Sequence, residues 1–157
     1  LTMSGAPLKY VGVFQNHDVD TVVGIAQELG LCAVQLHGDE DQNFVTAIHE
    51  QLGDHVEIWK AYGVTHSSPE LLDTPVSRHL LDTKVGSQTG GTGLVFDWSL
   101  IGDRSKVMLA GGISPFNAQK AAQQGCLGLD LNSGVEVSPG KKDAEKLQQA
   151  FDAIRSY

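Results

Sequence analysis

Six short apolar segments alternate along the chain with segments of helical periodicity, and this alternation most constrains the fold. It predicts strand–helix units built around a parallel sheet. A barrel and a doubly wound open sheet both repeat that unit, and a complete (β/α)8 barrel has eight strands. The pattern therefore fits two folds, a doubly wound open sheet and a barrel of which part is missing. The predicted strands comprise residues 9–14, 33–36, 56–61, 79–82, 107–110 and 128–131.

Capping residues indicate where helices begin and end between the first strands. Asp18 is a suitable N-cap for a helix over residues 19–29, and Gly30 is a suitable residue to end it. Asp39 and Glu40 are acidic residues of the kind that favour a helix N-terminus, so we expect them to begin the second helix.

Two further helices are predicted in the second half of the chain. Ser114 is expected to cap a helix that has Pro115 at its first position and runs to about Gln124. Asp143 is expected to cap the last helix. The buried face of that helix is predicted to carry Leu147, Phe151 and Ile154.

The composition excludes several classes of protein. A chain of 157 residues, 41% of them hydrophobic, is expected to form one domain over residues 1–157. No apolar run reaches the ~20 residues of a membrane helix, and the first residues lack the pattern of a signal peptide. The net charge of −8, without a basic run, argues against nucleic acid as a partner. We therefore expect a cytoplasmic protein that binds a small molecule, with no membrane partner.

The cysteine and histidine residues do not predict a metal site. Cys32 and Cys126 are far apart and show neither metal-binding nor redox spacing. The six histidines include no pair with metal-ligand spacing on a predicted helix. No metal is therefore expected.

A glycine-rich stretch follows the fourth predicted strand. Asp82 stands at the expected end of that strand. A carboxylate at a strand end followed by a mobile loop is typical of a catalytic acid under a lid. The same pattern also fits an ordinary strand-end carboxylate before a solvated linker. The lid would contain Gly90, Gly91 and Gly93.

Polar residues and glycines follow the other predicted strands, at the edge where parallel α/β folds carry their functional sites. Gly111 and Gly112 would let the backbone approach a ligand closely, and Asn132 and Ser133 could present N–H groups to a phosphate. Tight turns would explain the same glycines without any ligand. The remaining candidates at this edge are Gln35, His37 and Asp130.

Six sequence blocks together resemble the phosphoribosylanthranilate isomerase family. The blocks are VGVFQN, AVQLHGDE, IWKA, LLDTKVGSQTGGTGLVFDWSLI, VMLAGGISPFNA and GLDLNSGVEVSPGKKD. The resemblance runs from about Pro7 to the C-terminus. It is strongest to isomerase halves that follow an indole-glycerol-phosphate synthase domain in bifunctional proteins, so a fused synthase domain is a candidate partner.

The resemblance implies a (β/α)8 barrel of which this chain carries the C-terminal three-quarters, with its six strands as the third to eighth. It implies an Amadori rearrangement of N-(5'-phosphoribosyl)anthranilate in tryptophan biosynthesis, without a cofactor. Asp82 matches the general acid of the family. The positions that hold the phosphate match Gly111, Gly112, Asn132 and Ser133, and other positions at the rim of the barrel match Gln35, His37 and Asp130.

The general base of the family is a cysteine after the first strand, which neither Cys32 nor Cys126 matches. This chain alone is therefore expected to be inactive. Two other functions remain open at this point. The chain could be another phosphate-sugar isomerase or epimerase barrel, or a phosphate-binding fragment without catalysis.

Overall fold

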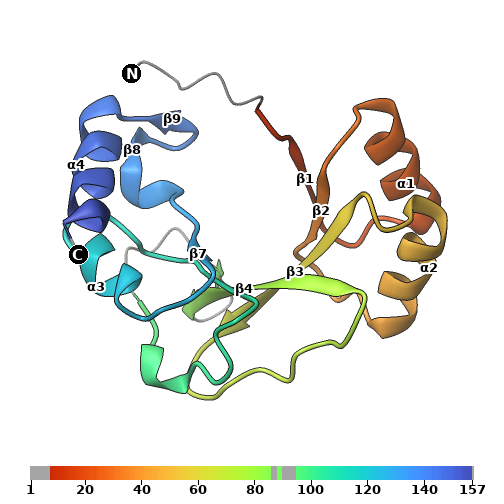
Figure 1. The fold of residues 1–157 in the computed structure, drawn as a ribbon, viewed down its shortest axis with the longest axis horizontal. Helices are drawn as coiled ribbons and strands as arrows, with labels where there is room; N and C mark the ends of the chain where they lie inside the picture. Colours follow the sequence, from red (N-terminus) through yellow and green to blue (C-terminus); the bar gives the residue numbers. More distant parts are fainter. Residues whose placement is uncertain (1–7, 86–87, 90–94, 157) are drawn as a thin grey trace. The chain divides into compact units, whose positions relative to one another are not determined.

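A computed structural model describes residues 8–85, 88–89 and 95–156. Each of the six predicted strands is present, and hydrogen-bonded neighbours follow the order β1-β2-β3-β4-β6-β7 (Figure 1). Parallel pairing joins β1 to β2, β2 to β3, β4 to β6 and β6 to β7. The predicted α/β fold with a parallel sheet is confirmed. The strand bounds are β1 Val11–Phe14, β2 Ala33–Leu36, β3 Glu57–Val64, β4 Val76–Val85, β6 Val107–Leu109 and β7 Gly128–Leu129.

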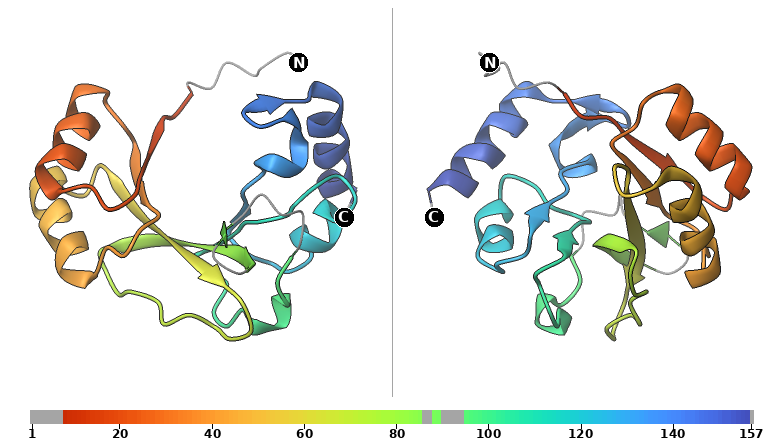
Figure 2. Two further views of the ribbon diagram at one scale, coloured as in Figure 1. Left: turned by 180° about the vertical axis from the view of Figure 1, so that it is seen from behind. Right: turned by 45° about the vertical axis from the view of Figure 1, so that its right-hand side comes forward.

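The chain divides into two compact units, of which the first comprises Leu1–Lys60 and Leu72–Ser77. Its helices are α1 (Val19–Glu28) and α2 (Gln42–Leu52), which lie side by side against β1 and β2 (Figure 2). Asp18 caps α1, as predicted. The residues with no exposed surface at the centre of this core are Val22, Val34, Leu36, Val45 and Ile48.

The second unit comprises Ala61–Leu71 and Arg78–Tyr157. Its core forms where α3 and α4 pack together beside β6 and β7, and Leu109, Ala118, Ala121 and Ala150 are fully buried there. Apart from α4, the elements of this unit that follow are short. Their bounds are β5 Gln88–Thr89, η1 Trp98–Leu100, α3 Ala118–Ala122, η2 Ser133–Val135, β8 Glu136–Ser138, β9 Lys141–Lys142 and α4 Ala144–Arg155.

The third predicted helix is shorter than expected because an asparagine closes a turn before it. The Asn117 side chain accepts a hydrogen bond from the Ser114 N–H (2.8 Å) and donates one to the Gly112 carbonyl (3.0 Å). The segment from Ser114 to Asn117 is therefore a turn, and the helix begins only at Ala118. The prediction that Ser114 caps this helix is wrong.

Phe151 in the last helix is 46% exposed, so the prediction that it is buried is also wrong. Ala150 is fully buried instead, and Leu147 and Ile154 pack against the same core. These three residues are spaced three and four positions apart, which is one face of a helix. Phe151 lies one position beyond that face.

Candidate active site

Asp82 lies within β4 rather than at its end. The strand continues to Val85, because Lys84 and Val85 pair in antiparallel register with Thr89 and Gln88 of β5. The expectation that the strand ends at Asp82 is therefore corrected. The predicted lid residues Gly90, Gly91 and Gly93 lie outside the described residues.

The carboxyl group of Asp82 packs against the backbone of Gly111, which follows β6. A Cβ atom at Gly111 would lie 2.1 Å from Asp82 Oδ1 and 2.5 Å from the Thr83 nitrogen. The φ angle of Gly111 is +78°, a conformation that side-chain-bearing residues rarely adopt. Glycine is thus required at this position for two independent reasons. Within the described part of the chain, Asp82 Oδ1 is buried and has no hydrogen-bond partner.

Burial raises the pKa of Asp82 to about 6 from its ordinary value of 3.8. The Thr83 N–H opposes this shift, whereas the negative charge of the nearby Asp130 adds to it. A carboxylic acid with such a pKa keeps a proton at a pH where an ordinary aspartate has lost it. Asp82 can therefore act as a proton donor close to neutral pH.

Thr83 holds Phe96, a residue that follows the glycine-rich stretch, next to Asp82. Its hydroxyl oxygen accepts a hydrogen bond from the Phe96 N–H (3.1 Å), and both residues are buried. The backbone beside Asp82 is thereby held from two sides, by Phe96 and by the close approach of Gly111.

The loops that follow β6 and β7 pack directly on one another. A Cβ atom at Gly134 would lie 2.0 Å from the Ile113 carbonyl oxygen, so only glycine fits there. Gly112 has a φ of +67°, and Ser133 begins the short helix η2. The two predicted phosphate-binding turns are therefore neighbours, and backbone N–H groups at such turns bind anions.

Asn132 is held by a lysine that the sequence pattern did not single out. Lys142 Nζ donates hydrogen bonds to Asn132 Oδ1 (2.6 Å) and to Glu136 Oε1 (2.7 Å). Lys142 reaches Asn132 because β8 and β9 form an antiparallel hairpin. The Gly-Lys-Lys run at 140–142 was the available signal, since a glycine at a predicted turn precedes it.

Gln35 and His37 lie together in the first unit. The Gln35 amide nitrogen Nε2 contacts His37 Nε2, and Gln35 is 8% exposed. The His37 N–H donates to the Phe14 carbonyl (2.8 Å), which joins the ends of β1 and β2. The structure thus brings these two candidates together. It also gathers Asp82, Gly111, Gly112, Asp130, Asn132 and Ser133 within the second unit.

Glu40 does not begin the second helix as expected. Asp41 is the N-cap of α2 and accepts a hydrogen bond from the Phe44 N–H (2.9 Å). Glu40 is buried and forms an ion pair with Lys60 of β3 (3.2 Å). A lysine in the otherwise apolar run IWKA was the sequence signal for a buried partner.

Metal-binding clusters and membrane-spanning helices are both absent from the described residues. No group of three or more His, Cys, Asp and Glu side chains in the described ranges is arranged to hold a metal ion. No helix in the described part of the chain has the length and apolar character needed to cross a membrane.

Comparison with known proteins assigns the chain to a family. The family model described as N-(5'phosphoribosyl)anthranilate (PRA) isomerase matches residues 1–153. The chain belongs to this family. The predicted resemblance to the phosphoribosylanthranilate isomerase family is confirmed.

The curated relatives are much longer than the chain. The tryptophan biosynthesis protein TrpCF of Vibrio parahaemolyticus is 69% identical over 157 residues, which are 100% of this chain and 33% of that protein. The protein of the same name from Vibrio cholerae is 60% identical, over 100% of this chain and 34% of that protein. The chain thus spans about a third of the length of these relatives.

Solved isomerase structures share the fold. The crystal structure of phosphoribosyl anthranilate isomerase from Thermus thermophilus is 33% identical, with a TM-score of 0.79 over 95% of this chain and 73% of that chain. A second isomerase structure, described as a complex with reduced 1-(o-carboxyphenylamino)-1-deoxyribulose 5-phosphate, is 28% identical with a TM-score of 0.73. The match extends over 98% of this chain and 75% of that isomerase chain.

The close approach of Gly111 to Asp82 can be tested with a matched pair of glycine variants. Gly140 has a φ of +79°, against +78° for Gly111, but a Cβ there would meet nothing within 4 Å. Gly140→Ala should therefore lower the free energy of unfolding by about 1 kcal/mol, the cost of the backbone conformation alone. Gly111→Ala should lower it by about 2 kcal/mol more, because the new methyl group clashes with Asp82 and Thr83. Urea unfolding measures both, and equal losses would contradict the described contact.

The raised pKa of Asp82 predicts that stability depends on pH. Because the folded state holds the Asp82 proton up to about pH 6 and the unfolded state only to about 3.8, the contribution of Asp82 to stability falls as pH rises through this window. Asp82→Asn removes this dependence. Relative to wild type, the variant should gain about 2 kcal/mol in free energy of unfolding between pH 4 and pH 7.5.

Urea unfolding at the two pH values measures this gain. Asp54→Asn is the matched control, since the Asp54 side chain is 98% exposed and should show only a small change. A difference between Asp82→Asn and wild type that is the same at both pH values would mean that Asp82 has an ordinary pKa.

Proposed function

We propose that the chain provides the isomerase activity of its family. It converts N-(5'-phosphoribosyl)anthranilate to 1-(2-carboxyphenylamino)-1-deoxyribulose 5-phosphate, a step of tryptophan biosynthesis. The single observation that carries this proposal is Asp82, a half-buried carboxyl group with a pKa of about 6 whose fully buried Oδ1 packs against Gly111. The names of the TrpCF relatives support it, as does the reduced deoxyribulose 5-phosphate compound bound to one of the solved isomerases.

Asp82 is the general acid in this proposal. Its proton passes to the ring oxygen of the ribose, the bond between that oxygen and C1 breaks, and the nitrogen lone pair forms a Schiff base with C1. A general base then removes the proton from C2, which gives an enolamine that becomes the ketone. An acid with a pKa near the working pH suits the first step, because it is partly protonated and still donates readily.

The phosphate is held by the turns at Gly111–Gly112 and Asn132–Ser133. The chain carries a net charge of −8, so its overall field repels an anion. Backbone N–H groups must therefore supply the attraction locally. The close packing of these two turns and the Lys142 contact with Asn132 favour a rigid site of this kind.

The remaining candidates complete the substrate site. Burial is the main cause of the raised pKa of Asp82, and the negative charge of Asp130 adds to it. Gln35 and His37 contact the substrate with hydrogen-bonding side chains that already touch each other. These roles follow from the matching positions of the family.

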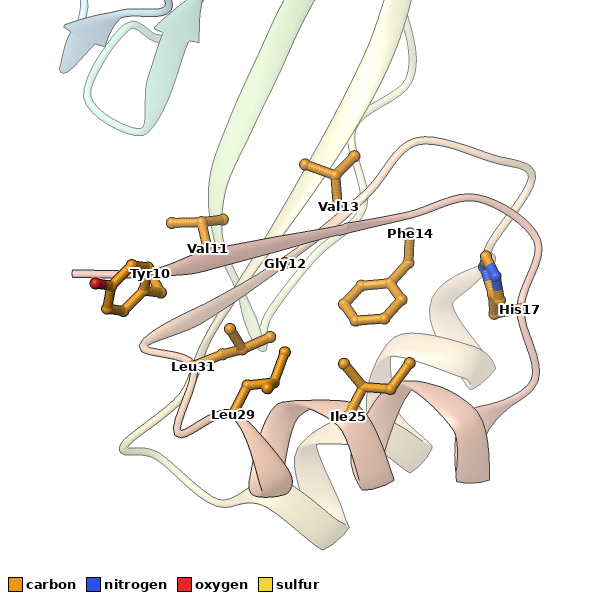
Figure 3. A pocket seen from close by; sticks show the side chains of 9 residues that line it. All are labelled: Tyr10, Val11, Gly12, Val13, Phe14, His17, Ile25, Leu29 and Leu31. Carbon is orange, nitrogen blue, oxygen red and sulfur yellow. The ribbon is translucent and has the colours of Figure 1, made fainter.

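The six parallel strands correspond in this proposal to the third to eighth strands of a (β/α)8 barrel. Within the described residues, β2 is the only strand paired with β1. A cavity of about 620 Å³ lies along β1. Phe14, Ile25, Leu29 and Leu31 line it between the strand and α1 (Figure 3). This apolar edge suits a further strand and helix of the same domain. The general base, a cysteine in the family, would come from that part of the domain.

We further propose that the protein is cytoplasmic and is attached to an indole-glycerol-phosphate synthase domain. The two free cysteines, Cys32 and Cys126, suit a reducing compartment. The length of the TrpCF relatives leaves room for a second domain.

Asp82→Asn in the full-length gene product tests the proposed function. The variant should lower kcat for the isomerisation by at least ~10²-fold, the usual contribution of a general acid. KM should change little, because asparagine has nearly the size of aspartate and leaves the backbone turn at Gly111 in place. The affinity for inorganic phosphate, followed by the amide signals of Gly111 and Gly112, should also be kept.

Asp54→Asn again provides the control and should retain wild-type kinetics. Wild-type kcat in Asp82→Asn would contradict the role of Asp82. A wild-type protein that binds phosphate at these turns but does not isomerise the substrate would overturn the proposed activity in favour of a phosphate-binding module.

A further inference from the structure

Lys60 and Glu40 form a buried ion pair next to the backbone of His37. Neither residue belongs to the predicted site. Lys60 is 5% exposed and Glu40 is 8% exposed, and Lys60 Nζ lies 3.2 Å from Glu40 Oε2. Both residues belong to the first unit, as does His37. Two charges removed from water in this way need an explanation beyond stability, because such a pair adds little to stability compared with apolar residues of the same volume.

The pair binds both peptide groups that adjoin the Cα atom of His37. Lys60 Nζ donates to the Leu36 carbonyl (3.4 Å), which lies in the peptide before His37. Glu40 Oε2 accepts from the Gly38 N–H (2.8 Å), which lies in the peptide after it. Lys60 also donates to the Gly38 carbonyl (2.7 Å). The backbone on either side of His37 is thereby fixed by two charged side chains.

The same pair ties this loop to the loop that follows β1. Glu40 Oε1 accepts from the Asn16 N–H (2.8 Å), and Asn16 Oδ1 accepts from the Asp39 N–H (2.7 Å). Asn16 has a φ of +55°, a left-handed conformation that its short polar side chain tolerates. A Cβ atom at Gly38 would lie 2.1 Å from Asn16 Oδ1, so the two loops are in direct contact.

Glu40 stays ionised in this setting. Burial alone would raise its pKa, but the Asn16 N–H, its own backbone N–H and the Lys60 ammonium group together lower it below the ordinary value. Charge-assisted hydrogen bonds of this kind are stronger and more directional than neutral ones. The loop that carries His37 is therefore held in one arrangement at neutral pH.

We propose that Lys60 and Glu40 are positioning residues for the substrate site, acting through His37 and its contact with Gln35. Neither residue touches the substrate. Their role is to fix the Leu36–Gly38 backbone, so that the imidazole ring meets the substrate without having to be ordered first. This inference rests on the proposed function, because it takes His37 as a substrate-binding residue.

A double-mutant cycle between Glu40 and His37 tests the inference in the full-length gene product. Glu40→Gln should raise KM for the isomerisation about tenfold with a smaller effect on kcat, because the charge that orders the His37 loop is lost. His37→Ala should raise KM at least as much. The double variant should show no further rise beyond His37→Ala, since Glu40 acts only through His37. Asp54→Asn is the control for removal of a carboxylate from the same unit.

A second readout does not need activity. In NMR spectra, the imidazole signal of His37 and the amide signal of Gly38 should shift and broaden in Glu40→Gln but not in Asp54→Asn. Lys60→Met leaves Glu40 buried without its partner, so its unfolding equilibrium constant should rise by about 10²-fold or more. Lys60→Met combined with Glu40→Gln removes both charges and should recover that stability, while KM stays raised.

These results separate the inference from the proposed function. If the wild-type protein does not isomerise the substrate, the proposed function fails, and the NMR signals of His37 still test the positioning. Unchanged His37 and Gly38 signals in Glu40→Gln would overturn the inference. An additive rise of KM in the Glu40 and His37 double variant would also overturn it, since the two residues would then act independently.

Discussion

The removal of the Glu40 and Asp82 carboxyl groups from water is the constraint on which the rest of this structure depends. A buried charge is tolerated only when donors or an opposite charge surround it. Glu40 is surrounded in this way by the Asn16 and Gly38 N–H groups and by Lys60, so its pKa is lowered. Asp82 has few such donors, and its pKa is raised to about 6. The two carboxyl groups thus differ in pKa because of their surroundings.

The difference in pKa suits Glu40 and Asp82 to different roles. An ionised, fully bonded carboxylate holds its neighbours in place and takes no part in proton transfer, as we propose for Glu40. A carboxyl group that is destabilised as an anion is ready to exchange a proton, as we propose for Asp82. The close approach of Gly111 adds to the burial of Oδ1, and burial is what raises the pKa. The same raised pKa makes the folded protein less stable at neutral pH, where Asp82 loses its proton.

Local signals predicted much of the fold. The bounds of β2 and the cap of α1 at Asp18 follow from residues within a few positions of each element, so the sequence alone was sufficient. The helix expected from Ser114 failed because the Asn117 side chain satisfies the backbone groups of the turn. Phe151 failed because the small residue Ala150 sets which face of α4 is buried.

The sequence predicted that several candidate residues lie close together, but not which other residues they contact. The order of the polar residues after successive strands was sufficient to predict that Gly111 and Asp130 lie near Asp82. The partners of Glu40 and Asn132 could not be predicted in this way. Lys60 and Lys142 reach them only after strands and hairpins have paired, and no local pattern in the sequence encodes those distances.

The most direct test of this account is a measurement of the pKa of Asp82 itself. The ¹³C chemical shift of its carboxyl carbon, assigned by comparison with Asp82→Asn, can be followed from pH 3 to pH 9 in the full-length gene product. We predict a midpoint of about 6. A midpoint near the ordinary aspartate value of 3.8 would mean that Asp82 is ionised at neutral pH and would contradict its role as the proton donor.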